Sequence, residues 1–68
     1  MKSQKQDLKR DIERNIGAFP SQNQIRNYLH RRKTFVIELM EGIEPMKDGR
    51  ATRYYAGDVA DRIIDRMM

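Results

Sequence analysis

Apolar residues recur every fourth position near the start of the chain, and mostly charged residues fill the positions between them. Leu8, Ile12 and Ile16 keep this spacing, which places all three on one face of a helix. The pattern therefore predicts a helix over residues 4–16. Gly17 follows at the position where helices commonly end in a left-handed residue.

A second amphipathic segment begins after a capping pattern. Ser21 and Gln24 have the spacing of a capping box, in which each side chain bonds the backbone amide of the other residue. This pattern predicts a helix over residues 22–29. Its core face should consist of three residues, Ile25, Tyr28 and Leu29.

A third helix is predicted at about residues 33–41, after a short turn over 30–32 that contains no glycine. Gly42 should end this helix. Four of its side chains are expected to be buried: Phe35, Val36, Leu39 and Met40. Its exposed positions should be Ile37, Glu38 and Glu41.

A β-hairpin is predicted next, with strands at 43–47 and 52–55. They should be joined around Asp48-Gly49, a dipeptide with a strong hairpin preference. Tyr54 and Tyr55 point to opposite faces of the second strand, so one of them should lie in the core.

These elements predict a mainly helical domain with a small β-hairpin. Their order is that of a winged helix-turn-helix with an extra N-terminal helix. We expect one domain over 1–68, with the helix-turn-helix at 21–42, the wing at 43–55 and a C-terminal helix at 57–67. The inward face of that last helix should consist of Val59, Ile63, Ile64 and Met67.

The composition excludes several classes of site. There is no cysteine, so disulfides and thiolate metal sites are excluded, and the lone His30 cannot hold a metal without several carboxylates beside it. Mean hydropathy is −0.89. No apolar run approaches the roughly eighteen residues of a membrane span, and no signal segment is expected. We expect a cytoplasmic, nucleoid-associated protein of a bacterial host cell, without a cofactor or a membrane partner.

The net charge of +4 favours anionic partners. The basic residues fall into two groups, one at 21–34 and one at 46–53, separated by three glutamates at 35–45. If both groups share one face of the fold, they fit a DNA duplex. The alternative is that a small, highly charged domain is simply well solvated.

Candidate DNA contacts follow from these two groups. In a helix-turn-helix, the first turn of the second helix meets base edges in the major groove. The residues near that position are Arg31, Arg32, Lys33 and Thr34. The cations of the wing are Lys47, Arg50 and Arg53. Such side chains can bind guanine or phosphate, or enter a minor groove. The alternatives are a solvated turn, with Thr34 as a cap, and a hairpin whose charges protect strand edges.

Two acids oppose this interpretation in part. Glu38 and Glu41 lie on the predicted reading helix and would repel phosphate. We expect them to pair with nearby arginines on the surface, and we expect DNA contact to be confined to the first turn of this helix.

From Pro20 to Ile64 the chain resembles the MerR-like winged-helix group that includes phage and transposon excisionases. The matching residues are Ser21, Ile25, Tyr28-Leu29, Val36, Leu39, Gly49-Arg50, Arg53-Tyr54-Tyr55 and Asp58-Val59. The resemblance implies DNA contact by Arg32, Lys33, Thr34, Arg50 and Arg53. The chain departs from the pattern at Arg26, where a small residue is usual, and at His30-Arg31, where a glycine and an apolar residue are common.

No arrangement of residues indicates an enzyme. His30 has no recognisable Ser or Cys partner, and the aspartates of the last helix alternate with Arg62 and Arg66, as on a surface ion-pair helix. We expect a sequence-preferring binder of double-stranded DNA from a phage or mobile element. It would act as an excisionase-like recombination directionality factor or a transcriptional regulator, as a homo-oligomer or cooperative assembly, with an integrase as a candidate partner.

Two alternatives remain open at this point. One is a protein-interaction adaptor, a phage protein that docks a polymerase, an integrase or a packaging enzyme. The acidic segment at 38–44 and the apolar stripe of the first helix motivate it. The other is the DNA-recognition domain of a viral genome-packaging subunit.

Overall fold

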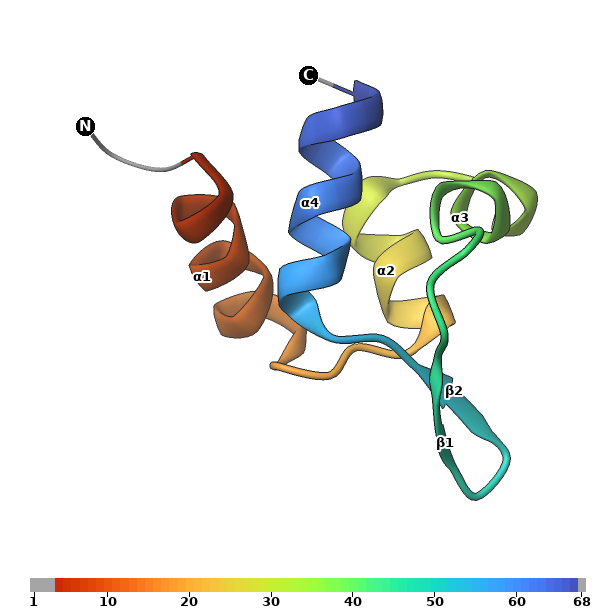
Figure 1. The fold of residues 1–68 in the computed structure, drawn as a ribbon. Helices are drawn as coiled ribbons and strands as arrows, with labels where there is room; N and C mark the ends of the chain where they lie inside the picture. Colours follow the sequence, from red (N-terminus) through yellow and green to blue (C-terminus); the bar gives the residue numbers. More distant parts are fainter. Residues whose placement is uncertain (1–3, 68) are drawn as a thin grey trace.

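Four helices and one two-stranded antiparallel sheet make up residues 4–67, the part of the chain that the computed structural model describes (Figure 1). The helices are α1 (Gln4–Ile16), α2 (Gln22–Leu29), α3 (Lys33–Leu39) and α4 (Ala56–Met67). The strands β1 (Met46–Asp48) and β2 (Ala51–Arg53) follow α3 and precede α4. The prediction of a mainly helical fold with a small hairpin is confirmed.

Helices α1 and α2 have the predicted bounds, and local signals fix both ends of α2. The capping box is formed: Ser21 Oγ accepts from the Gln24 amide at 3.2 Å, and Gln24 Oε1 accepts from the Ser21 amide at 2.8 Å. At the other end His30 takes the left-handed conformation, with φ 56°. Helices usually place glycine there because a Cβ is strained in that conformation.

Helix α3 is shorter than predicted, because its chain tightens before Gly42. Backbone bonds run from the Glu41 amide to the Glu38 carbonyl and from the Ile43 amide to the Met40 carbonyl. These span three residues rather than four, as in the last turn of many helices. Gly42, with φ 88°, then turns the chain away from the helix axis.

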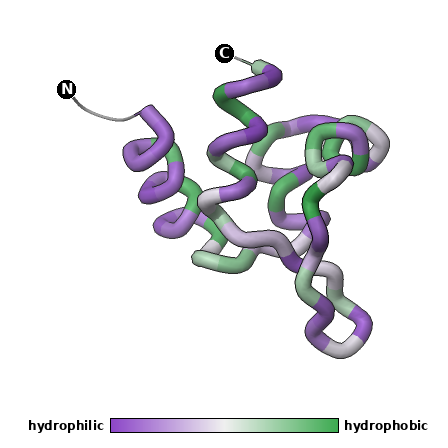
Figure 2. Tube along the Cα trace, viewed as in Figure 1, coloured by the Kyte–Doolittle hydropathy of each residue, from purple (hydrophilic) through white to green (hydrophobic). Residues whose placement is uncertain are grey.

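The core lies where all four helices meet, and apolar residues of the other helices gather around α4 (Figure 2). Its buried members are Ile12, Ile25, Val36, Leu39, Met40, Tyr54, Ala56, Val59, Ala60 and Ile63. Phe35, predicted to be buried, is only half-buried. Ile64 is half-buried and Met67 exposed, so the predicted inward face of the last helix is wrong at these positions. Ala56 and Ala60, in the first half of α4, are fully buried and pack in the core instead. The last turn of α4 extends beyond the neighbouring helices (Figure 1).

The hairpin is tighter than predicted, and its turn lies one residue later. Asp48 pairs with Ala51 and Met46 with Arg53, which leaves Gly49-Arg50 as a two-residue turn. Gly49 has φ 62°, the positive value that the first position of such turns requires. The predicted strand bounds 43–47 and 52–55 are therefore wrong.

The chain after β2 pairs with the segment before α2 instead of extending the hairpin. Ser21 bridges Arg53, the Tyr54 amide donates to the Pro20 carbonyl at 2.9 Å, and the Ala56 amide donates to the Ala18 carbonyl at 2.8 Å. This pairing anchors the base of the hairpin and turns Tyr54 into the core, while Tyr55 stays exposed. The prediction that one of the two tyrosines is buried is confirmed.

Candidate nucleic-acid interface

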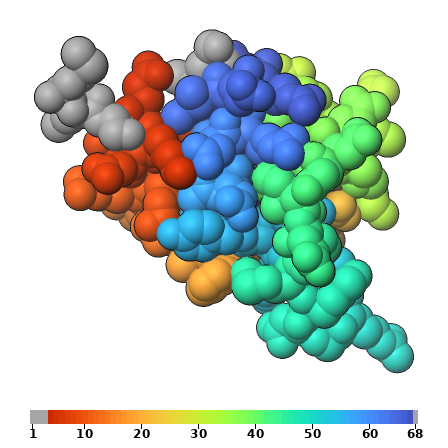
Figure 3. All heavy atoms as spheres, in the orientation of Figure 1, coloured from red at the N-terminus to blue at the C-terminus, as the bar shows by residue number. Residues whose placement is uncertain are grey.

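A groove at the foot of the hairpin brings together the two basic groups of the sequence. Lys33, the first residue of α3, lines it with Arg50 from the hairpin turn and Arg53 from β2. The other lining residues are Ser21, Gln22, Asn23, Ala51 and Thr52. We call this the basic groove. The hairpin beside it projects from the body of the molecule (Figure 3).

Of the three cations that line the basic groove, only Arg53 is paired with an acid within residues 4–67. No acidic side chain lines it. Lys33 and Arg50 are both exposed, and neither takes part in an ion pair within residues 4–67. Two cations that are distant in sequence and have no ionic partner within residues 4–67 therefore line one surface depression.

Arg53 differs from its two neighbours in the groove because its guanidinium already has partners. Nη1 donates to the Phe19 carbonyl at 3.0 Å, and Nε lies 3.4 Å from Asp48 Oδ2. These contacts tie β2 to the segment between α1 and α2 and to β1. Arg53 therefore holds the hairpin against the body of the domain, and its positive charge also adds to the electrostatic potential of the basic groove.

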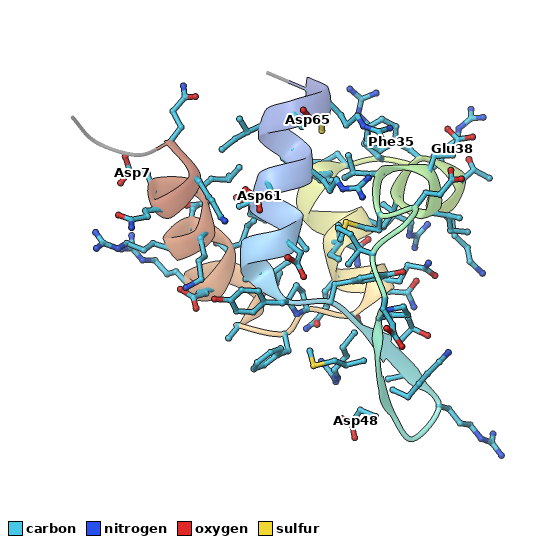
Figure 4. The ribbon with its side chains drawn as sticks, in the orientation of Figure 1. Asp7, Phe35, Glu38, Asp48, Asp61 and Asp65 are labelled. Carbon is cyan, nitrogen blue, oxygen red and sulfur yellow. The ribbon has the colours of Figure 1, made fainter. Side chains whose placement is uncertain are left out.

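The basic turn before α3 does not act as one unit. Arg31, Arg32 and Thr34 line a second hollow together with His30, Phe35 and Glu38. Arg31 stacks on Phe35, with its Cζ 4.8 Å from the ring centroid. Phe35 and Glu38, two of the residues that line this hollow, lie at α3, on the opposite side of the molecule from Asp7 on α1 (Figure 4). Lys33 alone of the basic turn lines the basic groove.

The prediction that Glu38 and Glu41 pair with nearby arginines is wrong. Both are exposed, and neither forms an ion pair in the part of the chain that the structure describes. The nearby arginines are occupied elsewhere. Arg31 stacks on Phe35, and Arg62 donates to the Leu39 carbonyl at 3.3 Å.

Lys47 lies on a third surface. It is exposed on β1, opposite Thr52, and lines a hollow with Phe19, Met46, Asp48 and Arg53 rather than with Lys33. Of the seven predicted contacts, the basic groove thus unites Lys33, Arg50 and Arg53 and leaves the others on neighbouring surfaces.

Sequence reasoning missed the polar side of the basic groove. Gln22 and Asn23 are the first two residues of α2, where backbone amides lack helical partners and favour anions. The capping pattern at Ser21 marks this helix start in the sequence. What the sequence did not reveal is that β2 pairs with Ser21 and so places the hairpin beside it.

Among residues 4–67, two titratable groups have clearly shifted pKa values, and both lie outside the basic groove. Tyr28 donates a hydrogen bond to the Asp11 carboxylate, and partial burial together with this bond raises the pKa of Tyr28 to about 12. The hydroxyl of Tyr55 and the nearby Glu13 raise the pKa of Lys9. Both shifts favour the form that prevails at neutral pH, so neither side chain is poised to exchange a proton there.

Among residues 4–67, no three His, Asp or Glu side chains gather as metal ligands, and no helix is long and apolar enough to cross a bilayer. Comparison with protein-family models, with curated proteins and with solved structures finds no match to this chain. The geometry of the chain itself therefore has to support any functional conclusion.

Proposed function

We propose that this protein binds double-stranded DNA with the basic groove and the hairpin, as a small winged-helix protein without a cofactor. One observation carries the proposal. Lys33 and Arg50 come from the two separate basic groups of the sequence, yet they line one groove that contains no acid.

Binding of this kind is driven by phosphate neutralisation. Each cation that contacts a phosphate releases a condensed counterion, which makes the affinity fall as salt rises. Lys33 and Arg50 would hold one backbone strand, and the free amides at the start of α2 would add donors at its side. The hairpin would follow the backbone or reach into the adjacent minor groove.

Base reading by α3 would be limited. Its outward face continues from Thr34 into Ile37 and Glu38, and only the first turn has side chains that favour DNA. We therefore infer an architectural role, in which several protomers coat or bend a site. This mode fits a recombination directionality factor, a transcriptional regulator or a genome-packaging subunit, because one small module specifies few base pairs.

A salt titration of duplex binding, followed by fluorescence anisotropy, tests the proposal. The slope of log K against log salt should become shallower by about 0.9 for each lost phosphate contact, so by roughly 1.8 in a Lys33→Ala/Arg50→Ala variant. The matched control is Arg14→Ala combined with Arg10→Ala, which removes the same charge from the exposed surface of α1.

The control should keep the wild-type slope if the groove is the site. Equal loss in both double variants would mean that only the net charge matters, and a wild-type affinity insensitive to salt would end the proposal. Measurement of DNA bending by end-to-end energy transfer would then test the architectural part.

A further inference from the structure

Two surfaces outside the basic groove expose large apolar side chains, and the charges around them differ in sign. Four of the five large apolar residues that are exposed within residues 4–67 belong to these surfaces: Phe19 (48%), Ile37 (47%), Met46 (42%) and Tyr55 (41%). The fifth is Met67 at the end of α4. Apolar residues grouped on a surface mark contact sites more often than scattered ones do.

The first surface, which we call the aromatic patch, consists of Phe19, Met46 and Tyr55. The rings of Phe19 and Tyr55 lie 5.9 Å apart between centroids, and Phe19 shares a hollow with Met46. Lysines border it on two sides. Lys9 lies 5.4 Å from the centroid of Tyr55, and Lys47 lines the hollow.

The charge at this patch is positive on balance. The acid that lines the hollow, Asp48, is paired with Arg53 at 3.4 Å, and the ion pair of Lys9 with Glu13 on its own helix is long, at 3.8 Å. Lys47 has no ionic partner among the described residues. A ligand for this surface would carry an apolar side chain flanked by carboxylates.

The second surface has that composition. It consists of Ile37 and Glu38 on α3, Glu41 three residues after Glu38, and Glu44 after the Gly42 turn; all four are exposed, and we call them the acidic surface. Glu38 also borders the hollow that contains Arg31 and Arg32. None of its three glutamates joins an ion pair in the described part of the chain, although the protein has a net charge of +4. Unpaired like charges on one surface repel each other, and opposite charges from a partner relieve that repulsion.

We propose that the acidic surface of one copy of this chain docks onto the aromatic patch of a second copy. Ile37 would enter the hollow between Phe19 and Met46, and the glutamates would face Lys9 and Lys47. Because the two surfaces differ, the contact is heterologous: in a dimer one copy keeps a free aromatic patch and the other keeps a free acidic surface. Association is then open-ended, which suits protomers that follow one another along a polymer.

Sedimentation velocity without DNA tests this self-association. Wild-type protein should sediment faster as its concentration rises at about 50 mM salt, and less so at about 1 M, where the screening length falls to about 3 Å. Two variants each remove one surface. Phe19→Ala/Met46→Ala lacks the aromatic patch, and Ile37→Ala/Glu41→Lys lacks the acidic surface.

Each variant alone should remain monomeric, and an equimolar mixture should form a one-to-one dimer, because each supplies the surface that the other lacks. Met67→Ala is the control: it removes the fifth exposed apolar residue and should associate like the wild type. Thermal melts of all four proteins show that the substitutions leave the fold intact.

Three results would overturn the proposal. If Ile37→Ala/Glu41→Lys associates alone, the aromatic patch pairs with itself. If the mixture stays monomeric, the two surfaces do not meet. If the wild type stays monomeric up to about 1 mM, any self-association has a Kd above that concentration and is too weak to be specific. The aromatic patch would then bind an acidic segment of another protein. Since the experiment contains no DNA, its failure leaves the DNA-binding proposal untouched, and the reverse also holds.

Discussion

Arg50 and Arg53 lie three residues apart on the same hairpin, yet their surroundings in the structure differ. Arg53 donates to the Phe19 carbonyl at 3.0 Å and lies 3.4 Å from Asp48, whereas Arg50 is exposed without an ionic partner in the described chain. Replacing each by alanine should therefore affect different properties. Arg53→Ala should reduce stability, and Arg50→Ala should reduce DNA affinity.

The expected loss for Arg53→Ala follows from its two contacts. A partly exposed hydrogen bond contributes about 1 kcal/mol, and a surface ion pair adds at most about 1 kcal/mol. A total near 1.5 kcal/mol lowers the Tm of a domain of this size by roughly 6–12 °C. Arg50→Ala removes a surface side chain without such contacts, and its effect should stay within about 0.5 kcal/mol.

Thermal melts by circular dichroism, paired with the salt titration, separate the two effects. Arg53→Lys is the matched control, because it keeps the positive charge but lacks the guanidinium that bonds the Phe19 carbonyl through Nη1 while Nε lies beside Asp48. It should retain DNA affinity while melting below the wild type. If Arg50→Ala and Arg53→Ala melt at the same temperature, the anchoring role of Arg53 is refuted.

Two further predictions concern stability. The pKa of Tyr28 is raised to about 12 from its ordinary 10.0. The protonated Tyr28 hydroxyl therefore stabilises the folded state fully below pH 10, and this stabilisation is lost as pH rises through 12. The urea midpoint of the wild type should therefore fall more steeply over that interval than that of Tyr28→Phe, and parallel curves would contradict this. His30 has φ 56°, so His30→Gly should relieve left-handed strain and raise stability by about 0.5–1 kcal/mol in urea titrations, whereas a lower midpoint would show that the imidazole makes a compensating contact.

The parts of the fold that were predictable are those set by near neighbours in the chain. The apolar spacing of α1 and the capping box of α2 need no information from elsewhere, and both helices have the predicted bounds. The hairpin depends on distant pairing. Its strand bounds follow from the bonds of Tyr54 and Ala56 to the segment before α2, which no local pattern indicates.

The same distinction applies to the candidate site. Arg31, Arg32 and Lys33 are consecutive, so the sequence alone suggested one basic cluster. The turn separates them, because Lys33 begins α3 and faces the hairpin while the two arginines line the hollow next to Phe35. Arg50 lines the same groove as Lys33 because β2 pairs with Ser21, and this pairing joins residues that are far apart in the chain.

If the protein binds DNA as proposed, Glu38 on α3 and Glu41 just after it limit how closely this helix can approach the duplex. Glu38 follows Lys33 by five residues, which at 1.5 Å per residue is about 7.5 Å along the helix axis. This separation is just below the screening length of about 8 Å at physiological salt, so a phosphate held by Lys33 would still feel part of the repulsion from Glu38. A helix laid along the major groove would instead bring Glu38 and Glu41 directly against the backbone. Contact by only the first turn of α3 and the hairpin would reduce this repulsion, and it would leave the acidic surface outside the duplex, where the proposed neighbouring protomer could reach it.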